Sequence, residues 1–140
     1  MDSLDSDAKL TRLIDYWAQA AKDDWETASS IHSKANEYGA ALFFLHLSLE
    51  KILKARVVEH TKTHAPYSHN LIVLLEKAGI TLPQDAIKLL SEINEFNMSG
   101  RYPMDRDAFK KRATKEFTDF YFQQGKQLWN LISQPCDQKP

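Results

Sequence analysis

A stretch of the chain between residues 40 and 60 is apolar on almost every side when it is wound as a helix. Its apolar residues are Leu42, Phe43, Phe44, Leu45, Leu47, Leu49, Ile52, Leu53, Val57 and Val58. Such a helix has no broad face for water, so several other elements must surround it. We expect it to be the central helix of an all-α domain and to end near His60, ahead of the proline-containing segment 61–67.

The first and last thirds of the chain predict amphipathic helices, because their apolar residues recur at steps of three and four. Between them, Ser68 and Asp105 are expected to be helix N-caps. Gly79 is expected to end a short helix, and Pro83 to lie in the first turn of the next one. The predicted helices cover about 5–33, 40–60, 70–77, 83–96 and 105–132.

Helices joined by short loops predict an all-α antiparallel up-down helical bundle of about five helices, three long and two short. The length of 140 residues favours a single domain, which we place at residues 1–135, followed by a flexible tail at residues 136–140.

The composition argues against several classes of protein. A formal net charge of −1 does not suit a nucleic-acid binder that is basic overall. A single cysteine, Cys136, leaves no disulfide framework and no cysteine-based metal site. The acidic N-terminus lacks the pattern of a signal peptide, and no apolar run has the length of a membrane span. We therefore expect a cytoplasmic protein with no membrane contact.

Three polar residues interrupt the central helix at intervals of four: His46, Glu50 and Lys54. This spacing stacks them on one side of the helix, with Glu50 and Lys54 in the favourable order for an ion pair. They are either an ion pair at the edge of the bundle with a nearby histidine, or a polar strip that lines a cleft for a ligand. Placing polar groups in an apolar helix costs stability unless each finds a partner.

The segment Gly100-Arg101-Tyr102-Pro103 is the second candidate site. Gly100 is expected to end a helix, and Pro103 to hold Tyr102 in extended geometry. A guanidinium held in this way could bind a phosphate or a carboxylate with two parallel hydrogen bonds. Alternatively, Arg101 pairs with an acid such as Glu50 and ties the loop to the bundle.

Three histidines, His60, His64 and His69, follow the central helix together with Tyr67. Two of them lie in a loop without a cluster of carboxylates or cysteines, so we expect no metal site. His69 lies at a helix start and could pack there or act as a general base. We expect no cofactor.

Residues 101–115 contain six basic and two acidic side chains, a local net charge of +4. This cluster is either a solvated helix face or a surface that contacts phosphate or RNA.

Together these residues resemble the HEPN family over about residues 10–132. The resemblance rests on Tyr16-Trp17, Tyr38 with Ala41–His46, Glu50–Ala55, Ser68-His69-Asn70-Leu71 and Arg101-Tyr102-Pro103. It implies a dimeric bundle of about five helices, often encoded beside a minimal nucleotidyltransferase, with a nucleotide- or RNA-linked role that is commonly half of a toxin–antitoxin pair. Many HEPN proteins are metal-independent ribonucleases with an arginine and a histidine separated by four to six residues.

This chain departs from the ribonuclease pattern. Three residues lie between Arg56 and His60, and seven between Arg56 and His64. This departure argues against ribonuclease activity and leaves binding as the preferred function. The positions that match the family's polar pattern, and that we take as candidate ligand-binding residues, are His46, Glu50, Lys54, His69, Arg101 and Tyr102.

Three functions therefore compete. The first is a homodimeric binding subunit that docks a nucleotidyltransferase or binds a nucleotide or RNA. The second is a ribonuclease that uses Arg56 with His60 or His64, or His69 with Arg101. The third is a purely structural interaction module. The sequence also suggests a homodimer, because four large rings give more apolar surface than the interior of a thin bundle needs: Trp17, Trp25, Phe43 and Phe44.

Overall fold

The computed structural model describes residues 6–34, 37–98 and 102–134, and this part of the chain contains six helices and no strands. The helices are α1 (Asp7–His32), α2 (Tyr38–Thr61), α3 (Leu71–Lys77), α4 (Gln84–Asn94), α5 (Pro103–Arg112) and α6 (Lys115–Ile132). The all-α class is confirmed. The count of about five is one too few. The predicted tail at 136–140 lies outside the described residues.

The predicted fifth helix is two helices, because the chain leaves helical geometry at Ala113, whose ψ is 70°. Thr114 then caps α6: its side-chain oxygen accepts a hydrogen bond of 3.2 Å from the backbone N–H of Phe117. The start of α5 also differs from the prediction. Its N-cap is Tyr102 and its first residue is Pro103, so Asp105 lies inside the first turn instead of capping it.

The short helix α3 ends as predicted and starts with a different cap. Asn70, not Ser68, is its N-cap, and the Asn70 side chain accepts hydrogen bonds from two backbone N–H groups of the first turn. Gly79 follows the helix with a φ of 69°, a left-handed conformation that suits glycine. Pro83 is the N-cap of α4 and so lies one position before its predicted place in the first turn.

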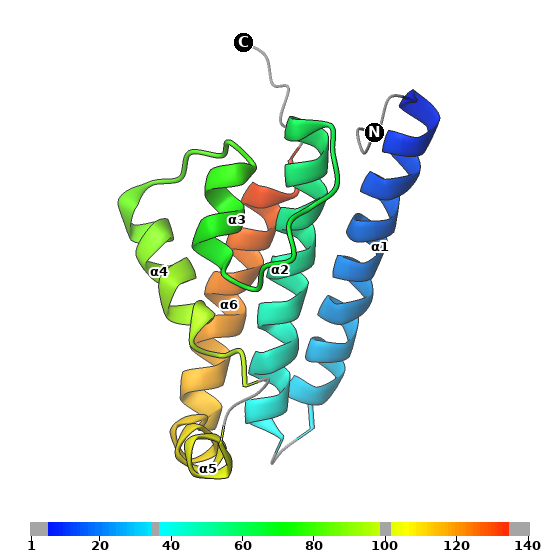
Figure 1. The fold of residues 1–140 in the computed structure, drawn as a ribbon. Coiled ribbons are helices and arrows are strands. Elements are labelled where there is room, and N and C mark those ends of the chain that lie inside the picture. Colours follow the sequence, from blue (N-terminus) through cyan, green and yellow to red (C-terminus); the bar gives the residue numbers. More distant parts are fainter. Residues whose placement is uncertain (1–5, 35–36, 99–101, 135–140) are drawn as a thin grey trace.

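Helix α2 lies in the centre and contacts α1, α3, α5 and α6 (Figure 1). Figure 1 shows α1 and α2 running in opposite directions, whereas α6 runs in the same direction as α2. The contacts agree, because Ser48 meets Trp129 and Arg56, farther along α2, meets Ser133. The prediction of an antiparallel up-down arrangement is therefore wrong for this pair. The return of the chain through α4 and α5 brings the start of α6 back to the level of the start of α2.

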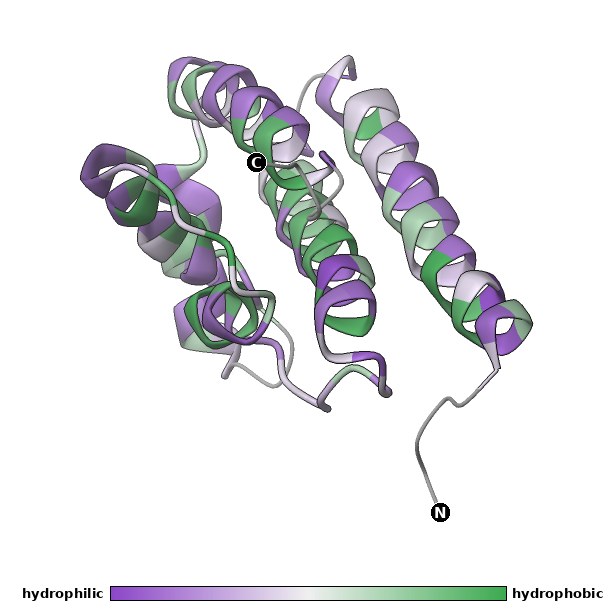
Figure 2. Ribbon diagram, turned by 90° about the horizontal axis from the view of Figure 1, so that it is seen from above, coloured by the Kyte–Doolittle hydropathy of each residue, from purple (hydrophilic) through white to green (hydrophobic). Residues whose placement is uncertain are grey.

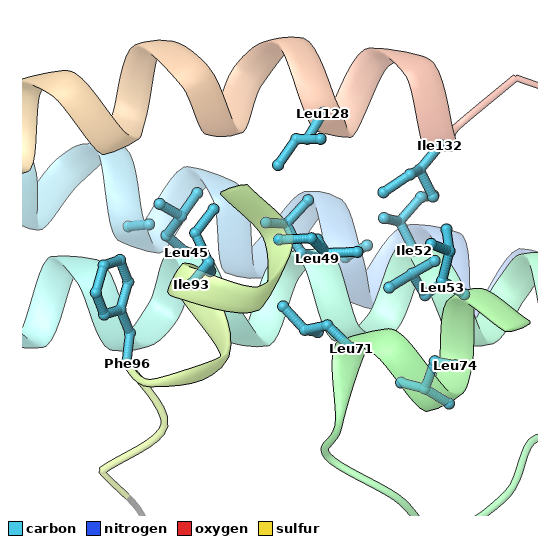
Figure 3. Packing of buried hydrophobic residues seen from close by; sticks show 14 of the residues in the cluster. Leu45, Leu49, Ile52, Leu53, Leu71, Leu74, Ile93, Phe96, Leu128 and Ile132 are labelled. Atoms are coloured by element: carbon cyan, nitrogen blue, oxygen red, sulfur yellow. The ribbon is translucent and has the colours of Figure 1, made fainter. Parts of the chain in front are cut away.

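The core lies where α2 faces α3, α4 and α6. Figure 3 shows leucines and isoleucines from these four helices pointing toward one another, with Phe96 at one edge. Figure 2 shows that α2 is largely hydrophobic, whereas α1 carries hydrophilic residues on its outer side. Gly125 lets α6 approach α2 closely, since a Cβ there would lie 2.9 Å from the Leu45 side chain. The prediction of a central buried helix is confirmed.

Two other expectations concern the surface. In the described ranges, none of the helices combines the length and the apolar character needed to cross a membrane. The rings of Trp17, Trp25 and Phe44 pack against the core while remaining partly exposed. They therefore contribute to the fold of one chain, and they support a homodimer less strongly than the sequence suggested.

A buried polar cluster that reaches the surface at His69

The three polar residues of α2 are buried, not exposed at an edge of the bundle. The exposed fraction is 0% for His46, 3% for Glu50 and 5% for Lys54. Since all three lie on one side of the central helix, as their spacing predicts, their polar atoms depend on each other and on the neighbouring elements for partners.

The carboxylate of Glu50 is the centre of this cluster. Its Oε2 accepts a hydrogen bond of 3.1 Å from the ammonium group of Lys54. Both carboxylate oxygens also lie within hydrogen-bond distance of the Nδ1 of His69, at 3.1 and 3.2 Å. Lys54 in turn lies 5.2 Å from the ring of Trp17 on α1, close enough for a cation–π contact. The buried negative charge therefore has a cation and an N–H donor beside it.

His46 supports the same arrangement from the other side. Its Nε2 donates a hydrogen bond of 3.2 Å to the backbone carbonyl of His69, which can only accept. This fixes the proton on Nε2 and leaves Nδ1 4.0 Å from Glu50, without a hydrogen-bond partner among the described residues. Burial lowers the pKa of His46, against the opposing effect of the Glu50 charge. We conclude that His46 is neutral near pH 7.

His69 is the member of the cluster that reaches solvent. Its side chain is 53% exposed although its Nδ1 faces the buried carboxylate. Because Nδ1–H donates to Glu50, the second nitrogen, Nε2, carries a lone pair that can accept a proton or a hydrogen bond. The ring of Tyr67 lies 6.0 Å away and is 98% exposed. An oriented imidazole and an exposed aromatic ring thus lie side by side at the surface.

The segment that carries His69 is held from two directions. Asn70 follows it directly and caps α3. Asn94 at the end of α4 accepts a hydrogen bond of 2.8 Å from the backbone of Leu71 and donates one of 3.0 Å to the Asn70 side chain. Asn94 was not among the residues predicted from the sequence. The sequence feature that could have indicated its role is a polar side chain directly after the core residue Ile93.

A model of the HEPN domain family matches residues 14–132 of the chain. The chain belongs to the HEPN family. This confirms the resemblance drawn from the sequence, and the matched region contains His46, Glu50, Lys54 and His69. A search of curated proteins and a search of solved structures gave no match.

In this HEPN domain, Arg56, the arginine considered for ribonuclease chemistry, is buried and bonded to neighbouring residues. Arg56 is 6% exposed and donates hydrogen bonds of 2.9 and 3.2 Å to the backbone carbonyls of Ser133 and Gln134. It also lies 3.2 Å from the carboxylate of Glu59. Arg56 therefore ties the end of α6 to α2, and a role in binding an RNA phosphate would compete with these contacts.

The two other histidines of the predicted group, His60 and His64, lie apart from the Glu50 cluster. His60 is exposed and packs against Gly79, where an added Cβ would lie 2.7 Å from its Nε2. His64 is exposed in the segment between α2 and α3. In the portion of the HEPN domain that is described, no three His, Cys, Asp or Glu side chains come together as a metal site.

Of the predicted segment Gly100-Arg101-Tyr102-Pro103, the structure describes Tyr102 and Pro103. Arg101 lies outside the described residues of the HEPN domain. Tyr102 is 77% exposed at the start of α5 and, within the described segments, makes no ring contact or side-chain hydrogen bond with His46, Glu50, Lys54 or His69. The basic side chains that follow are exposed on α5 and at the start of α6: Arg106, Lys110, Lys111, Arg112 and Lys115.

Proposed function

We propose that this HEPN protein is the homodimeric binding subunit of a nucleotidyltransferase-linked pair of the toxin–antitoxin type, and that it binds a nucleotide or RNA at His69. Membership of the family supports the class of function. The observation that carries the proposal is the geometry of His69: a buried carboxylate orients the imidazole while 53% of the side chain stays exposed. The exposed Nε2 of this oriented ring is therefore accessible to a ligand.

The chemistry of the surface fits a nucleotide. A base can stack on the exposed ring of Tyr67, since aromatic side chains provide such platforms in single-stranded RNA recognition. His69 can exchange a hydrogen bond with the ribose or the phosphate through Nε2. Arg101 remains a predicted phosphate contact, and Tyr102 a predicted second ring.

Isothermal titration with ATP and with a short single-stranded RNA tests this site. We expect Tyr67→Ala to weaken binding by about 1–3 kcal/mol, the usual contribution of one stacked base. His69→Ala should weaken it by about 1 kcal/mol or more through the lost hydrogen bond. Arg101→Ala tests the predicted phosphate contact in the same titration.

Two variants in the same chain serve as matched controls. Tyr16→Ala removes a tyrosine that is 62% exposed on α1, and His64→Ala removes an exposed histidine from the same segment as His69. Both should bind like the unmodified protein. Binding at His69 is ruled out if millimolar ligand gives no heat, or if the controls lose as much affinity as the site variants.

The partner and the dimer need separate measurements. The product of a neighbouring nucleotidyltransferase gene, if one is present, should co-purify with this protein. Sedimentation at micromolar concentration should give the mass of two chains, about twice 16.1 kDa. A single species at the mass of one chain would remove the homodimer from the proposal and leave the ligand site standing.

Ribonuclease activity is a second candidate, favoured by the Nδ1–H hydrogen bond from His69 to Glu50. It leaves Nε2 as the acceptor that a general base needs to remove a proton from a ribose 2′-hydroxyl. Incubation with RNA in EDTA tests it. Cleavage that disappears in His69→Ala and persists in His64→Ala would support it. Intact RNA, or cleavage that persists in His69→Ala, would exclude His69 as the base.

A further inference from the structure

A second candidate site lies at the start of α2, and Lys54 lies farther along the same helix. A cavity of about 610 Å³ opens between the first turns of α2 and the helix α5. Ligand cavities in proteins span roughly 300–1,000 Å³, so this one has the size for a small organic molecule. None of its lining residues belongs to the Glu50 cluster.

The inner wall of the cavity is apolar and aromatic. Phe109 is only 4% exposed and packs against the backbone of α2, where a Cβ on Gly39 would lie 3.8 Å from its ring. Tyr38, Phe43 and Met98 line the same cavity and are partly exposed. A flat apolar group could lie against these side chains and displace water from them.

The rim of the cavity is cationic. Arg106 and Lys110 lie four residues apart on α5, so their side chains lie on the same side of the helix. Both are exposed, and neither makes an ion pair within the ranges described. One carboxylate, Glu37, also lines the cavity. Two like charges at this spacing repel each other, and a bound anion would remove that cost.

Two other basic side chains of the same region, Arg112 and Lys115, already have partners. Arg112 lies over the rings of Phe109 and Phe117, at 5.9 and 5.5 Å. Lys115 makes an ion pair of 2.7 Å with Asp119. Arg106 and Lys110 differ from these two residues, because neither makes an ion pair or a cation–π contact among the described residues.

We propose that this cavity binds an organic anion, a phosphate or a carboxylate carried on a flat apolar ring. Arg106 and Lys110 bind the anionic group, and Phe43 and Phe109 cover the ring. The inference goes beyond the function proposed for His69 and does not depend on it. Tyr67→Ala should therefore leave this binding unchanged.

Isothermal titration with 1-naphthyl phosphate tests the site. We expect it to bind at least about tenfold more tightly than inorganic phosphate or neutral naphthol, since it alone uses both the rim and the inner wall. Titrations of the Tyr67→Ala variant with AMP and 1-naphthoate then distinguish a nucleotide from an aromatic acid as the source of the anion, without a contribution from the His69 site. Equal affinity for 1-naphthyl phosphate and inorganic phosphate would overturn the proposal.

Two neighbouring lysines provide a matched pair of variants. Lys110→Gln should weaken 1-naphthyl phosphate binding by about tenfold, the effect of one lost charge-assisted hydrogen bond. Lys111→Gln removes the same charge from an exposed residue that does not line the cavity, and should have little effect. An equal loss in both variants would show general charge attraction and overturn the site.

Gly39→Ala tests the inner wall without harming the fold. The added methyl group meets Phe109 at an ordinary contact distance and favours the helix, so the melting temperature should stay the same or rise. It should also narrow the cavity and weaken 1-naphthyl phosphate binding. Unchanged affinity would contradict the assigned wall. If the probe binds only at protein concentrations low enough to dissociate a dimer, the face is an interface between two copies, and the ligand proposal is wrong.

Discussion

At the scale of single residues, the charge of Glu50 largely determines how the polar cluster affects the stability of the fold. Its carboxylate and the ammonium group of Lys54 are both nearly removed from water, and each compensates the charge of the other. A buried ion pair of this kind contributes little compared with apolar residues of the same size, whereas one unpaired buried charge is costly.

We predict that Glu50→Leu lowers the free energy of unfolding by about 3–5 kcal/mol, because Lys54 is left charged and buried. The double variant Glu50→Leu with Lys54→Met should recover most of this loss, since no buried charge remains. Urea unfolding of both variants measures the difference. A loss below about 1 kcal/mol in the single variant would contradict the buried pair.

The same double variant separates two interpretations of the cluster. If the polar residues only stabilise the fold, the double variant keeps every binding activity. If Glu50 orients His69 for a ligand, the double variant is stable but binds the nucleotide or RNA more weakly.

Part of this cluster could be predicted from the sequence, because the four-residue spacing fixes His46, Glu50 and Lys54 on one side of a helix. The sequence could not show that this side of the helix faces into the bundle. The contact between His69 and Glu50 spans 19 residues and a loop, and the ring of Trp17 comes from another helix. Spacing along one helix contains no information about such neighbours.

At the scale of the helices, the end of α3 depends on a glycine for two reasons. Gly79 has a left-handed φ, and its missing Cβ leaves space for the ring of His60 from the end of α2. The stop signal itself was visible in the sequence, whereas its contact with α2 required the fold.

We predict that Gly79→Ala lowers the free energy of unfolding by about 1–2 kcal/mol, through left-handed strain and the contact with His60. In the background of His60→Ala, the cost of Gly79→Ala should no longer include the contact with the His60 ring. The cost of the left-handed backbone conformation should remain. Thermal unfolding of the four proteins separates the two contributions. Equal costs of Gly79→Ala in both backgrounds would show that His60 moves away freely.

The division between α5 and α6 shows where periodicity misleads. Phe109, Ala113 and Phe117 follow one another at steps of four, so the apolar pattern continues across the break. The available signal was Thr114, a residue that favours the N-cap position. A local hydrogen-bonding residue thus decided the structure against the hydrophobic pattern.

At the scale of the whole molecule, the parallel course of α2 and α6 was hidden from the sequence. Short loops indicate antiparallel neighbours, but α2 and α6 are not consecutive, and three shorter helices lie between them. The order of helices could be predicted, and their directions relative to α2 could not.

The stability of the molecule should depend on pH through His46. Its pKa in the folded protein is lowered by burial, so below its ordinary value of 6.5 the unfolded chain binds a proton that the folded chain does not. Stability should therefore fall as the pH decreases from 7.5 to 5.5. The groups that face His46 are Glu50 on the same helix and His69 on the following segment.

Urea unfolding at the two pH values measures this effect, with His46→Gln as the comparison, because glutamine keeps an N–H donor for the His69 carbonyl. The variant should lose less stability on acidification than the unmodified protein. Asp119, whose pKa is lowered chiefly by its hydrogen bond with Lys115, loses its contribution only as the pH falls below about 3.8 and does not overlap with this range. Identical losses in both proteins would exclude His46 as the cause.

The pairing of α6 with α2 also has a consequence for synthesis on the ribosome. Arg56 meets its carbonyl partner 77 residues later, and Ser48 meets Trp129 after 81 residues. The α1–α2 hairpin can form as soon as it emerges, but one side of α2 stays uncovered until almost the entire chain has been translated. During that interval the nascent protein exposes its most apolar segment, and chaperones that bind such segments would recognise it there.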